Sequence, residues 1–505
     1  MHTLTERYAR QVAGELECLD RVIITGTLPT ICHAGGMTSF LFEQGIRIFD
    51  YTQFAEPLRN RIRKNAERLA AEAGIEIDFI RRKNFRKKDR IQAILGKRGD
   101  HPGLVHIFSA MESCNAYKPW HDKKTHRTFL KPTSGKCLHY YFYFIDAQLG
   151  LCHLRVPTWC PFRLQFYFNG HNHLARKLDG RGIAYNLHDN AFTQIDDWDT
   201  AQRLADAFDV EQLHRILDRY AARFCPVNKD FGQRYHWSIM QAECARDIVF
   251  KRMADLQAVY EHITRTAIHT VKPDHVATFL GRKLHPNYLG ELGNHYHTRI
   301  EGTCITHHMG NKAAIKMYDK FGRILRIETK VNDVTFFKHY REVEHRDGTS
   351  TMEQAPMRKT IYSIPTLMGL CRAANRRYLE FVSDIDDPGT GLKSVQKIAA
   401  PAKANGRSAR GFNLFQRDDH RLFVAIARGE FTISGLTNRA LRRVLPDKTG
   451  RQISWLLRRL RLHGLIKKIG RTYKYYLTRL GRRVIVAALK LREFTVVPAL
   501  ARTAT

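Results

Sequence analysis

Polar and apolar residues alternate along IKMYDKFGRILRIETKVND, the stretch from Ile315 to Asp333. A period of two places alternate side chains on opposite faces of a β-strand, and the turn-forming residues in the middle favour a hairpin. With a three-residue loop at 320–322, Ile315 lies opposite Ile327. A slip of one residue would mix the two faces, so the pattern predicts a hairpin with one apolar face and one polar face.

The polar face of this hairpin carries four candidate catalytic residues, Lys316, Tyr318, Arg326 and Glu328. In the predicted register Lys316 faces Arg326, and such a like-charge pair destabilises a sheet unless a carboxylate or a phosphate lies between the cations. Nearby positive charge lowers the pKa of a phenol and stabilises an oxyanion, so Tyr318 is suited to attack a phosphodiester. The alternative is that this face only holds a nucleic-acid backbone.

The charge of the chain indicates an anionic partner. Its 505 residues carry a net charge of +34, with a pI near 10.0, and nucleic acid is the leading candidate. No apolar run approaches the roughly 20 residues needed to span a bilayer, so a membrane partner is not expected. The first 20 residues lack the apolar core of a secretory signal, and the ten cysteines form no CxxC pair. A cytoplasmic protein with reduced thiols is therefore expected, and the sequence permits an oligomer.

The first part of the body alternates between strand and helix patterns. DRVIITG, IRIFDY, IEIDFI and GLVHIFSA are predicted strands, and MTSFLFEQG, TQFAEPLRNRIRKNAERLAAEAG and KKDRIQAILGKRG are predicted helices. This order favours a largely parallel sheet, so residues 1–135 are predicted to be an α/β domain. The polar stretch from Glu112 to Lys136 is predicted to be a loop or a short ribbon.

Residues 136–385 are predicted to form a mixed α+β domain rich in β-hairpins. KCLHYYFYFID, GLCHLRVPTW and FRLQFYFNG read as strands, the last closed by a turn at Asn169-Gly170. Helical patterns run from about Asp196 to Val271 and include WSIMQAECARDIVFKRMADLQAVYEHITRTAI as one long helix. Together with the first domain, the predicted fold class is α/β and α+β, a multi-domain body with mixed sheets.

Residues 386–410 are rich in Gly, Pro, Ala and Lys without an apolar period, which predicts a linker. Residues 411–505 carry 21 Lys and Arg against 5 Asp and Glu. Their pattern predicts two helices, a third helix opened by a Thr449–Gln452 capping box, a basic hairpin and a closing helix.

This order of elements resembles the winged helix-turn-helix domain of the MarR type, and LIKKIGRTYKYYLTRLGRRV resembles its wing and the helix that follows. The resemblance covers roughly 85 residues and implies that residues 411–505 bind duplex DNA, with the third helix in the major groove. It gives nine candidate nucleic-acid contacts, Gln452, Ser454, Arg458, Arg459, Arg461, Lys467, Lys468, Arg471 and Lys474. The alternatives are a winged helix that contacts proteins and a basic face that is merely solvated.

A second resemblance concerns the opening hairpin. The pattern Tyr-Asp-Lys followed by Leu-Arg-Ile-Glu, within residues 315–332, resembles a segment of the gene II and gene X type replication initiators of phages and plasmids, which nick DNA through tyrosine. The resemblance does not identify which tyrosine is the nucleophile. Such enzymes generally have a His-apolar-His metal pair on a strand, whereas this chain offers only His171-Asn172-His173, which fits a helix cap better.

A different enzymatic hypothesis places acidic residues around two magnesium ions, as in RNase H-like nucleases and transposases. The acids in or beside predicted strands are Asp20, Asp146, Glu301 and Glu328. Of these, Asp146, Glu301 and Glu328 are the candidate metal ligands, for Mg²⁺ or Mn²⁺. Histidines at 295, 297, 307 and 308 are a further candidate cluster beside Glu301.

Aromatic residues of the predicted strands suggest a third class of site. They could form a stacking platform for single-stranded nucleic acid, DNA or RNA, although alternating aromatics in a central sheet usually face the core. The set comprises Tyr140, Tyr141, Tyr143, Phe166, Tyr167 and Phe168.

The sequence therefore predicts a DNA-binding protein that processes DNA by nicking, strand transfer or replication initiation in a mobile or replicating element. Its chemistry would be that of a metal-dependent or a tyrosine nuclease or transposase. The alternative is a non-catalytic transcriptional regulator or RNA-binding protein that uses the same surfaces.

Overall fold

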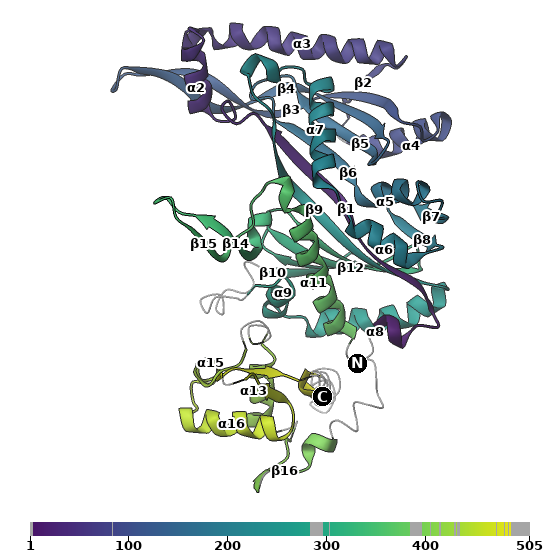
Figure 1. Cartoon of the computed structure of the whole chain (residues 1–505), viewed down its shortest axis with the longest axis vertical. Helices are drawn as coiled ribbons and strands as arrows, with labels where there is room; N and C mark the ends of the chain where they lie inside the picture. The colour runs from purple at the N-terminus through teal and green to yellow at the C-terminus, as the bar shows by residue number, and fades with distance from the viewer. Residues whose placement is uncertain are drawn as a thin grey trace, which may run out of the picture. The chain divides into compact units, whose positions relative to one another are not determined.

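The structure is a computed structural model (Figure 1). It describes residues 4–82, 84–282, 296–301, 304–383, 396–404, 406–413, 416–428, 431, 435–470, 472–478, 480–482 and 484–485. The chain divides into two compact units, the first of residues 1–15, 245–330 and 369–505 and the second of residues 16–244 and 331–368. Strands β1 (Val12–Thr27) and β9 (His236–Phe250) each contribute residues to both units.

An eleven-stranded sheet organises the body, in the order β10-β11-β12-β13-β9-β1-β6-β5-β4-β3-β2. It confirms the predicted mixed α/β body. The prediction of a largely parallel sheet near the N-terminus is wrong, because β1 pairs antiparallel with β6 and β3 antiparallel with β4. Among the pairings whose register the structure describes, only β2 with β3 is parallel. The physical reason lies in IRIFDY, which forms a 3-10 turn at Ile48–Asp50 and the start of a helix, so the strand needed for a parallel crossover is missing.

The second unit holds the following further elements: α2 (Ala34–Glu43), α3 (Tyr51–Glu72), β2 (Ile77–Phe79), α4 (Lys87–Arg98), β3 (Gly103–Asp122), β4 (Arg127–Asp146), β5 (Gly150–Pro157), β6 (Leu164–Asn169), α5 (Gly170–Asp179), β7 (Tyr185–His188), β8 (Ala191–Ile195), α6 (Trp198–Asp206), α7 (Val210–Phe224), β14 (Lys338–Glu344) and β15 (Ser350–Pro356). Strands β7 and β8, and β14 and β15, form separate antiparallel hairpins.

The core of the second unit lies where α7 packs on the sheet. Phe224 stacks on Phe142 with ring centroids 4.4 Å apart, and Tyr220 stacks on Phe144 at 3.9 Å. Helix α7 forms because its apolar residues recur at helical spacing and because Asp209 caps it, accepting a hydrogen bond from the N–H of Gln212. Successive residues of β4 point to opposite faces, so the intervening tyrosines face away from α7.

One local prediction in this unit is wrong, and another is decided between its two alternatives. The predicted turn at Asn169-Gly170 is the start of α5, where the Asn169 side chain accepts hydrogen bonds from the N–H groups of His171 and Asn172. The stretch from Glu112 to Lys136 is the ribbon of the two predicted alternatives and not the loop: β3 and β4 pair continuously from Gly103 with Ile145 to Asp122 with Arg127, apart from a bulge beside Leu104. Alternation of large polar and apolar residues is compatible with a solvated ribbon as well as with a loop, which is why the pattern was ambiguous.

The prediction of one long helix beginning at Trp237 is wrong for its first half and confirmed for its second half. Residues 236–250 form strand β9, and only α8 (Met253–Thr270) is helical. The β-branched pair Ile248-Val249 is a weak signal for a strand, but the spacing of apolar residues also fits a helix. Pairing in the centre of a large sheet decides the outcome, since tertiary contacts override a weak local preference.

The first unit holds α1 (Leu4–Arg7), α8, α9 (Pro273–Phe279), β10 (Tyr296–Glu301), β11 (Cys304–Met309), β12 (Ala313–Lys320), β13 (Ile324–Val331) and α11 (Ile364–Ser383), which begins in the second unit. Strands β12 and β13 are the predicted hairpin. Its loop has three residues, as predicted, but lies one position later than expected, at 321–323. Phe321 and Gly322 both have positive φ, 57° and 70°, and the N–H of Arg323 donates to the oxygen of Lys320.

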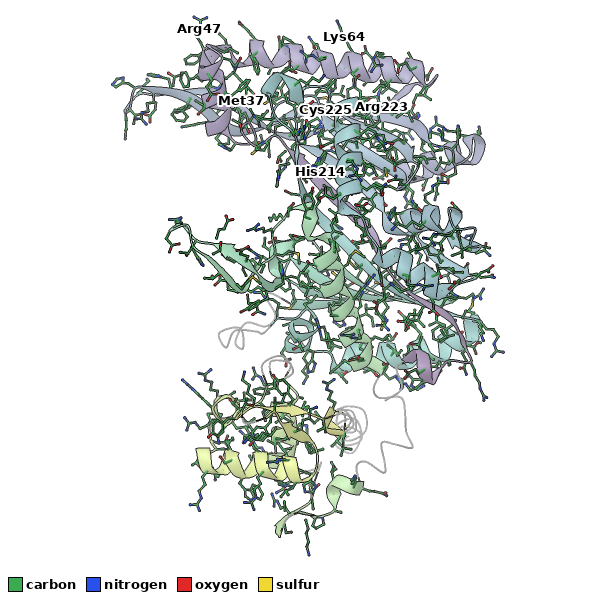
Figure 2. All side chains as sticks on the ribbon, viewed as in Figure 1. Met37, Arg47, Lys64, His214, Arg223 and Cys225 are labelled. Atoms are coloured by element: carbon green, nitrogen blue, oxygen red, sulfur yellow. The ribbon has the colours of Figure 1, made fainter. Side chains whose placement is uncertain are left out.

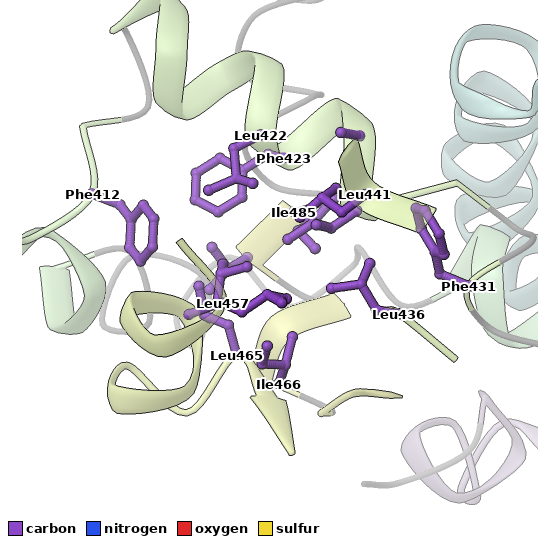
Figure 3. Close-up of a cluster of buried hydrophobic side chains, with 14 of the residues drawn as sticks. Phe412, Leu422, Phe423, Phe431, Leu436, Leu441, Leu457, Leu465, Ile466 and Ile485 are labelled. Carbon is purple, nitrogen blue, oxygen red and sulfur yellow. The ribbon is translucent and has the colours of Figure 1, made fainter. Parts of the chain in front are cut away.

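The C-terminal segment contains helices α13 (Arg417–Ile426), α15 (Asn438–Val444) and α16 (Gly450–Leu462), followed by the hairpin of β18 (Ile466–Lys468) and β19 (Tyr475–Leu477). Leu436 bridges to Tyr475 beside this hairpin. The predicted capping box between Thr449 and Gln452 is present. Buried apolar side chains hold the segment together, and those labelled in Figure 3 include Phe412, Leu422, Phe423, Leu441, Leu457, Leu465 and Ile466. Ile453 and Leu460 belong to the same cluster.

Two of the predicted divisions of the chain, the boundary after residue 135 and the linker, can be located on the structure. The boundary after residue 135 lies inside β4. Within the predicted linker, residues 386–395 lie outside the described residues, whereas β16 (Ala402–Ala404) and β17 (Arg407–Ala409) pair as a short hairpin.

Candidate acidic site and neighbouring pocket

Three buried carboxylates meet on neighbouring strands at the centre of the sheet. Asp20 lies on β1, Glu243 on β9 and Glu328 on β13, and the sheet order places β9 between the other two. Each residue offers a carboxylate oxygen, and the three oxygens lie within 4.8 Å of one another. Like charges at such distances repel strongly away from water, so this acidic site has the donor set that suits a divalent cation.

Two asparagines hold the Asp20 carboxylate. Asn169 Nδ2 donates to Asp20 Oδ1 at 2.8 Å, and Asn190 Nδ2 lies 2.6 and 2.7 Å from the two Asp20 oxygens. His171 Nδ1 is 3.3 Å from Asp20 Oδ1. Asn169 also caps α5 through its side-chain oxygen, so the end of β6 and the start of α5 fix the orientation of Asp20 together.

Two hairpin residues hold the Glu328 carboxylate. Lys316 Nζ is 2.8 Å from Glu328 Oε1, and the phenol of Tyr318 donates to Oε2 at 2.9 Å. Glu328 is therefore the carboxylate that the sequence required beside Lys316. The other cation of the polar face, Arg326, is fully buried and forms two hydrogen bonds of 2.6 Å with Asp247 on β9.

The expected direction of the Tyr318 pKa is wrong. Burial raises the pKa of Tyr318, and the adjacent Glu328 carboxylate raises it further, against a smaller opposing effect of Arg326. The predicted cations are present but each is matched by its own carboxylate, so their field at the phenol is largely cancelled. The structure brings together all four predicted catalytic residues on one hairpin, with Tyr318 as a protonated hydrogen-bond donor.

The candidate metal ligands do not all lie at the acidic site. Glu328 belongs to the acidic site, and so does Asp20, which the two-magnesium hypothesis also named. Asp146 does not: it accepts hydrogen bonds from Tyr220 and from the N–H groups of the turn at 148–149, and it pairs with Arg219 at 2.5 Å. The side chain of Glu301 lies outside the described residues.

Sequence reasoning missed Glu243, because the segment that carries it was predicted to be helical. Only its placement on β9 puts the Glu243 side chain beside those of β1 and β13. The histidine candidates do not join the site as a metal pair. His171 and His173 lie on α5, and His307 is buried against Tyr378, where burial lowers its pKa to about 4. The side chains of histidines 295 and 297 are not among those described.

A pocket of about 630 Å³ adjoins the acids within the second unit. Asp20 and Glu243 contribute to its wall together with two exposed cations, Arg21 and Lys88. Lys88 pairs with Asp189 at 2.6 Å. The aromatic part of the wall comprises Tyr143, His153, Tyr167 and Tyr185. Carboxylates, cations and aromatic faces thus converge in one cavity of the size that small-molecule and nucleotide ligands occupy.

A second hollow of about 350 Å³ shares Arg21, His153 and Tyr167 with this pocket. His153 stacks on Tyr167 at 4.8 Å, and burial lowers the pKa of His153 to about 3, so the ring is neutral. On the same hollow, Glu112 accepts from Arg155 at 2.7 Å and from the phenol of Tyr141 at 2.6 Å.

The predicted aromatic platform divides into two sets, as strand alternation requires. Tyr141, Tyr143 and Tyr167 line the hollows. Tyr140 and Phe168 are core residues, and Phe166 is a fully buried ring that contacts Phe144. Half of the set therefore serves the core.

The predicted nucleic-acid contacts of the C-terminal segment are mostly exposed. Arg458, Arg461, Lys467, Lys468 and Lys474 are exposed and pair with no carboxylate in the described part of the chain. Gln452 serves the capping box, and Ser454 accepts a hydrogen bond from Asn438. Arg471 lies outside the described residues.

The prediction that Arg459 contacts nucleic acid is wrong. It is 1% exposed and forms two hydrogen bonds to Asp419, at 2.6 and 2.9 Å, while its guanidinium lies 3.8 Å from the ring centroid of Phe412. Helical spacing places residue 459 beside Leu456, which packs against the buried apolar cluster, so this arginine holds the segment together and does not meet a ligand.

No protein-family model, curated protein or solved structure matches this chain. Among the described helices, none is both long enough and apolar enough to cross a membrane.

Proposed function

We propose that the protein is a metal-dependent enzyme that cleaves or transfers phosphodiester bonds in DNA, with the DNA held by its C-terminal segment. The observation that carries this proposal is the convergence of Asp20, Glu243 and Glu328, whose oxygens lie within 4.8 Å of one another beside a pocket with cationic and aromatic walls. Buried carboxylates that converge beside a pocket are typical of functional sites.

The residues around the acids fit Mg²⁺ or Mn²⁺. Both are hard cations that take carboxylate oxygens as ligands. The amides of Asn169 and Asn190 orient Asp20, and Lys316 and Tyr318 orient Glu328, which corresponds to the outer-sphere support that metal-binding carboxylates usually have. When bound, such a metal supplies a polarised phosphoryl oxygen and a water of lowered pKa.

The pocket residues supply the recognition of the substrate. Arg21 and Lys88 are exposed cations at the wall and suit phosphate oxygens. Tyr143 and Tyr167 offer aromatic faces on which a base can stack. Burial raises the pKa of both phenols, so they remain neutral hydrogen-bond donors near the reacting phosphate.

The C-terminal segment supports the duplex-binding part of the proposal. Its order of helix, bridge strand, two helices and hairpin supports the proposal of a winged helix. The exposed cations on α16 and on the hairpin would meet phosphates, which gives affinity without adding to the chemistry.

A tyrosine nicking mechanism is the second enzymatic candidate, favoured by the position of Tyr318 next to Glu328. In that mechanism the Tyr318 oxygen would form a bond to phosphorus while Glu328 accepts the phenol proton. The bond from phosphorus to one sugar oxygen would break, and that oxygen would leave as a hydroxyl after taking a proton from water. The two mechanisms differ in one product: attack by Tyr318 leaves a covalent protein–DNA adduct, and attack by water does not.

The test is incubation of the full chain with labelled single- and double-stranded DNA and RNA, with Mg²⁺, with Mn²⁺ and with EDTA. Metal-dependent cleavage of DNA without an adduct, abolished in Glu243→Gln and retained in Tyr318→Phe, is the expected result. An adduct that disappears in Tyr318→Phe would favour tyrosine nicking. Absence of cleavage on every substrate, with duplex binding intact, would overturn the enzymatic proposal in favour of a non-catalytic regulator. RNA cleavage alone would replace DNA as the substrate.

A further inference from the structure

The ends of β3 and β4 form a two-stranded ribbon with which no other described strand pairs. The two strands pair with each other as far as Asp122 and Arg127, whereas β5 pairs with β4 only at residues 139–146 and β2 pairs with β3 only at residues 107–109. Figure 1 shows the two strands continuing past α2 as a separate ribbon. The paired residues at the ends of β3 and β4, 113–122 and 127–136, therefore have one strand neighbour each.

One face of this ribbon is anchored. The phenol of Tyr117 donates to the oxygen of Ile31 at 2.8 Å, and the N–H of Leu130 donates to Thr38 Oγ1 at 3.0 Å. Tyr117 and Leu130 are buried in this contact. The ribbon is thus held at a fixed angle by α2 and the loop before it, which makes it a presented surface and not a loose arm.

The opposite face is cationic and aromatic. Cross-strand pairing puts Lys118 directly opposite Lys131 and Trp120 directly opposite Phe129. Lys131 Nζ lies 3.6 Å from the ring centroid of Trp120, and Trp120 is 41% exposed. We define this ribbon face by Lys118, Trp120, Arg127 and Lys131.

The charge of the ribbon has no internal counterpart. Residues 113–136 carry six Lys and Arg and a single acid, Asp122. That acid serves the turn, where it accepts a hydrogen bond from the N–H of Lys124 at 2.9 Å. No ion pair joins the ribbon cations to a carboxylate within the described ranges of the chain. Lys118 opposite Lys131 is a like-charge pair that destabilises the free ribbon and that an anion between the two would relieve.

We propose that the ribbon face binds double-stranded DNA by entering the major groove, as a second DNA-binding surface besides the C-terminal segment. The major groove of B-form DNA admits a two-stranded β-ribbon, and its walls bring phosphates within reach of cations on both strands. The deep, narrow major groove of A-form RNA does not admit one. The spacing of cations on both strands around a central Trp120 suits a groove with a phosphate wall on each side. This surface does not depend on the acidic site.

The test measures duplex binding by the full chain in EDTA, with a 20-base-pair DNA between 50 and 200 mM KCl. Removing three phosphate contacts in K118A/R127A/K131A should make the dependence of log K on log salt shallower by about two to three. The charge-retaining variant K118R/K131R should keep the wild-type slope. The matched control R63A/K64A/K97A removes three exposed cations from α3 and α4, Lys64 being labelled in Figure 2, and should leave the slope almost unchanged.

An unchanged slope in the ribbon variant, or an equal loss in the control variant, would overturn the proposal. An equal loss of affinity for double-stranded RNA would overturn the choice of the DNA groove, and displacement of the DNA by polyglutamate of equal charge would assign the face to acidic protein. If the triple variant does not fold, as checked by circular dichroism, the single variant Arg127→Gln at the solvated tip replaces it, with an expected change in slope of about one.

Discussion

The acidic site and the C-terminal segment differ in the burial and in the partners of their charged side chains. At the acidic site the charges are buried and oriented by named partners, such as the two asparagines on Asp20 and the Lys316 and Tyr318 groups on Glu328. On α16 and its hairpin the cations other than Arg459 are exposed, and Arg458, Arg461, Lys467, Lys468 and Lys474 have no carboxylate partner in the described residues. Buried, oriented charge serves local chemistry and is insensitive to salt, whereas exposed charge serves affinity and is screened by salt.

The largest expected effect separates these two roles. Glu243→Gln keeps the size of the side chain and removes one anionic oxygen from the acidic site, so metal-dependent cleavage should fall by at least about a hundredfold. Duplex affinity in EDTA should not change. The control is Glu76→Gln, an exposed acid, which should retain full activity. Wild-type cleavage by the Glu243→Gln variant would contradict the assignment of chemistry to the acidic site.

The second prediction uses two neighbours on α16. Arg459→Met leaves the buried Asp419 carboxylate without its partner and should lower the free energy of unfolding of the C-terminal segment by about 3–5 kcal/mol. Arg458→Met, one residue earlier and exposed, should change stability by less than about 0.5 kcal/mol and weaken duplex binding instead. Thermal and denaturant unfolding, with anisotropy for DNA, measure both. Equal effects of the two variants would contradict the division into buried and exposed charge.

The third prediction concerns salt. Replacing Arg458, Arg461, Lys467, Lys468 and Lys474 by alanine should make the salt dependence of duplex binding shallower by about four to five, since each phosphate contact contributes about 0.9. Metal-dependent cleavage at saturating DNA should persist. If this variant lost cleavage at saturating DNA while its affinity for duplex DNA was unchanged, the cations of the C-terminal segment would take part in the reaction. That result would contradict the comparison.

The smallest effect concerns Lys87, which lies 3.2 Å from the ring centroid of Tyr141, a residue of the smaller hollow. Burial lowers the pKa of Lys87 to about 8, against a smaller effect of Glu112 that raises it. The unfolded chain, with the ordinary pKa of 10.5, then binds more protons between pH 8 and 10.5, so this group makes stability rise with pH in that window.

Lys87→Met removes this titration. The stability of the variant relative to wild type should therefore be greatest below pH 8 and should decline as the pH rises toward 10, as measured by denaturant unfolding at several pH values. Lys88→Met, at an exposed neighbour, is the control and should show no such trend. A difference that is independent of pH would show that the Lys87 amine is not desolvated.

Parts of the fold were predictable because they depend on local patterns. The hairpin of Lys316 and Glu328 follows from strict alternation, and the capping box at Thr449 from two polar residues three apart. Strand β9 was not predictable, since its apolar spacing fits a helix about as well. With β9 unrecognised, Glu243 could not be placed beside Asp20, although Asp20 and Glu328 had each been named.

The sequence by itself determined the period of each element, the excess of positive charge and its concentration at the C-terminus. The tertiary structure alone decided which charged residues are buried and what they meet. Arg458 and Arg459 carry the same side chain one position apart, yet a rotation of about 100° along a helix places one in solvent and the other on Asp419. Asp20, Glu243 and Glu328 are likewise far apart in the chain, and only pairing within one sheet brings their oxygens together, because hydrogen bonding between strands fixes side chains that no local pattern relates.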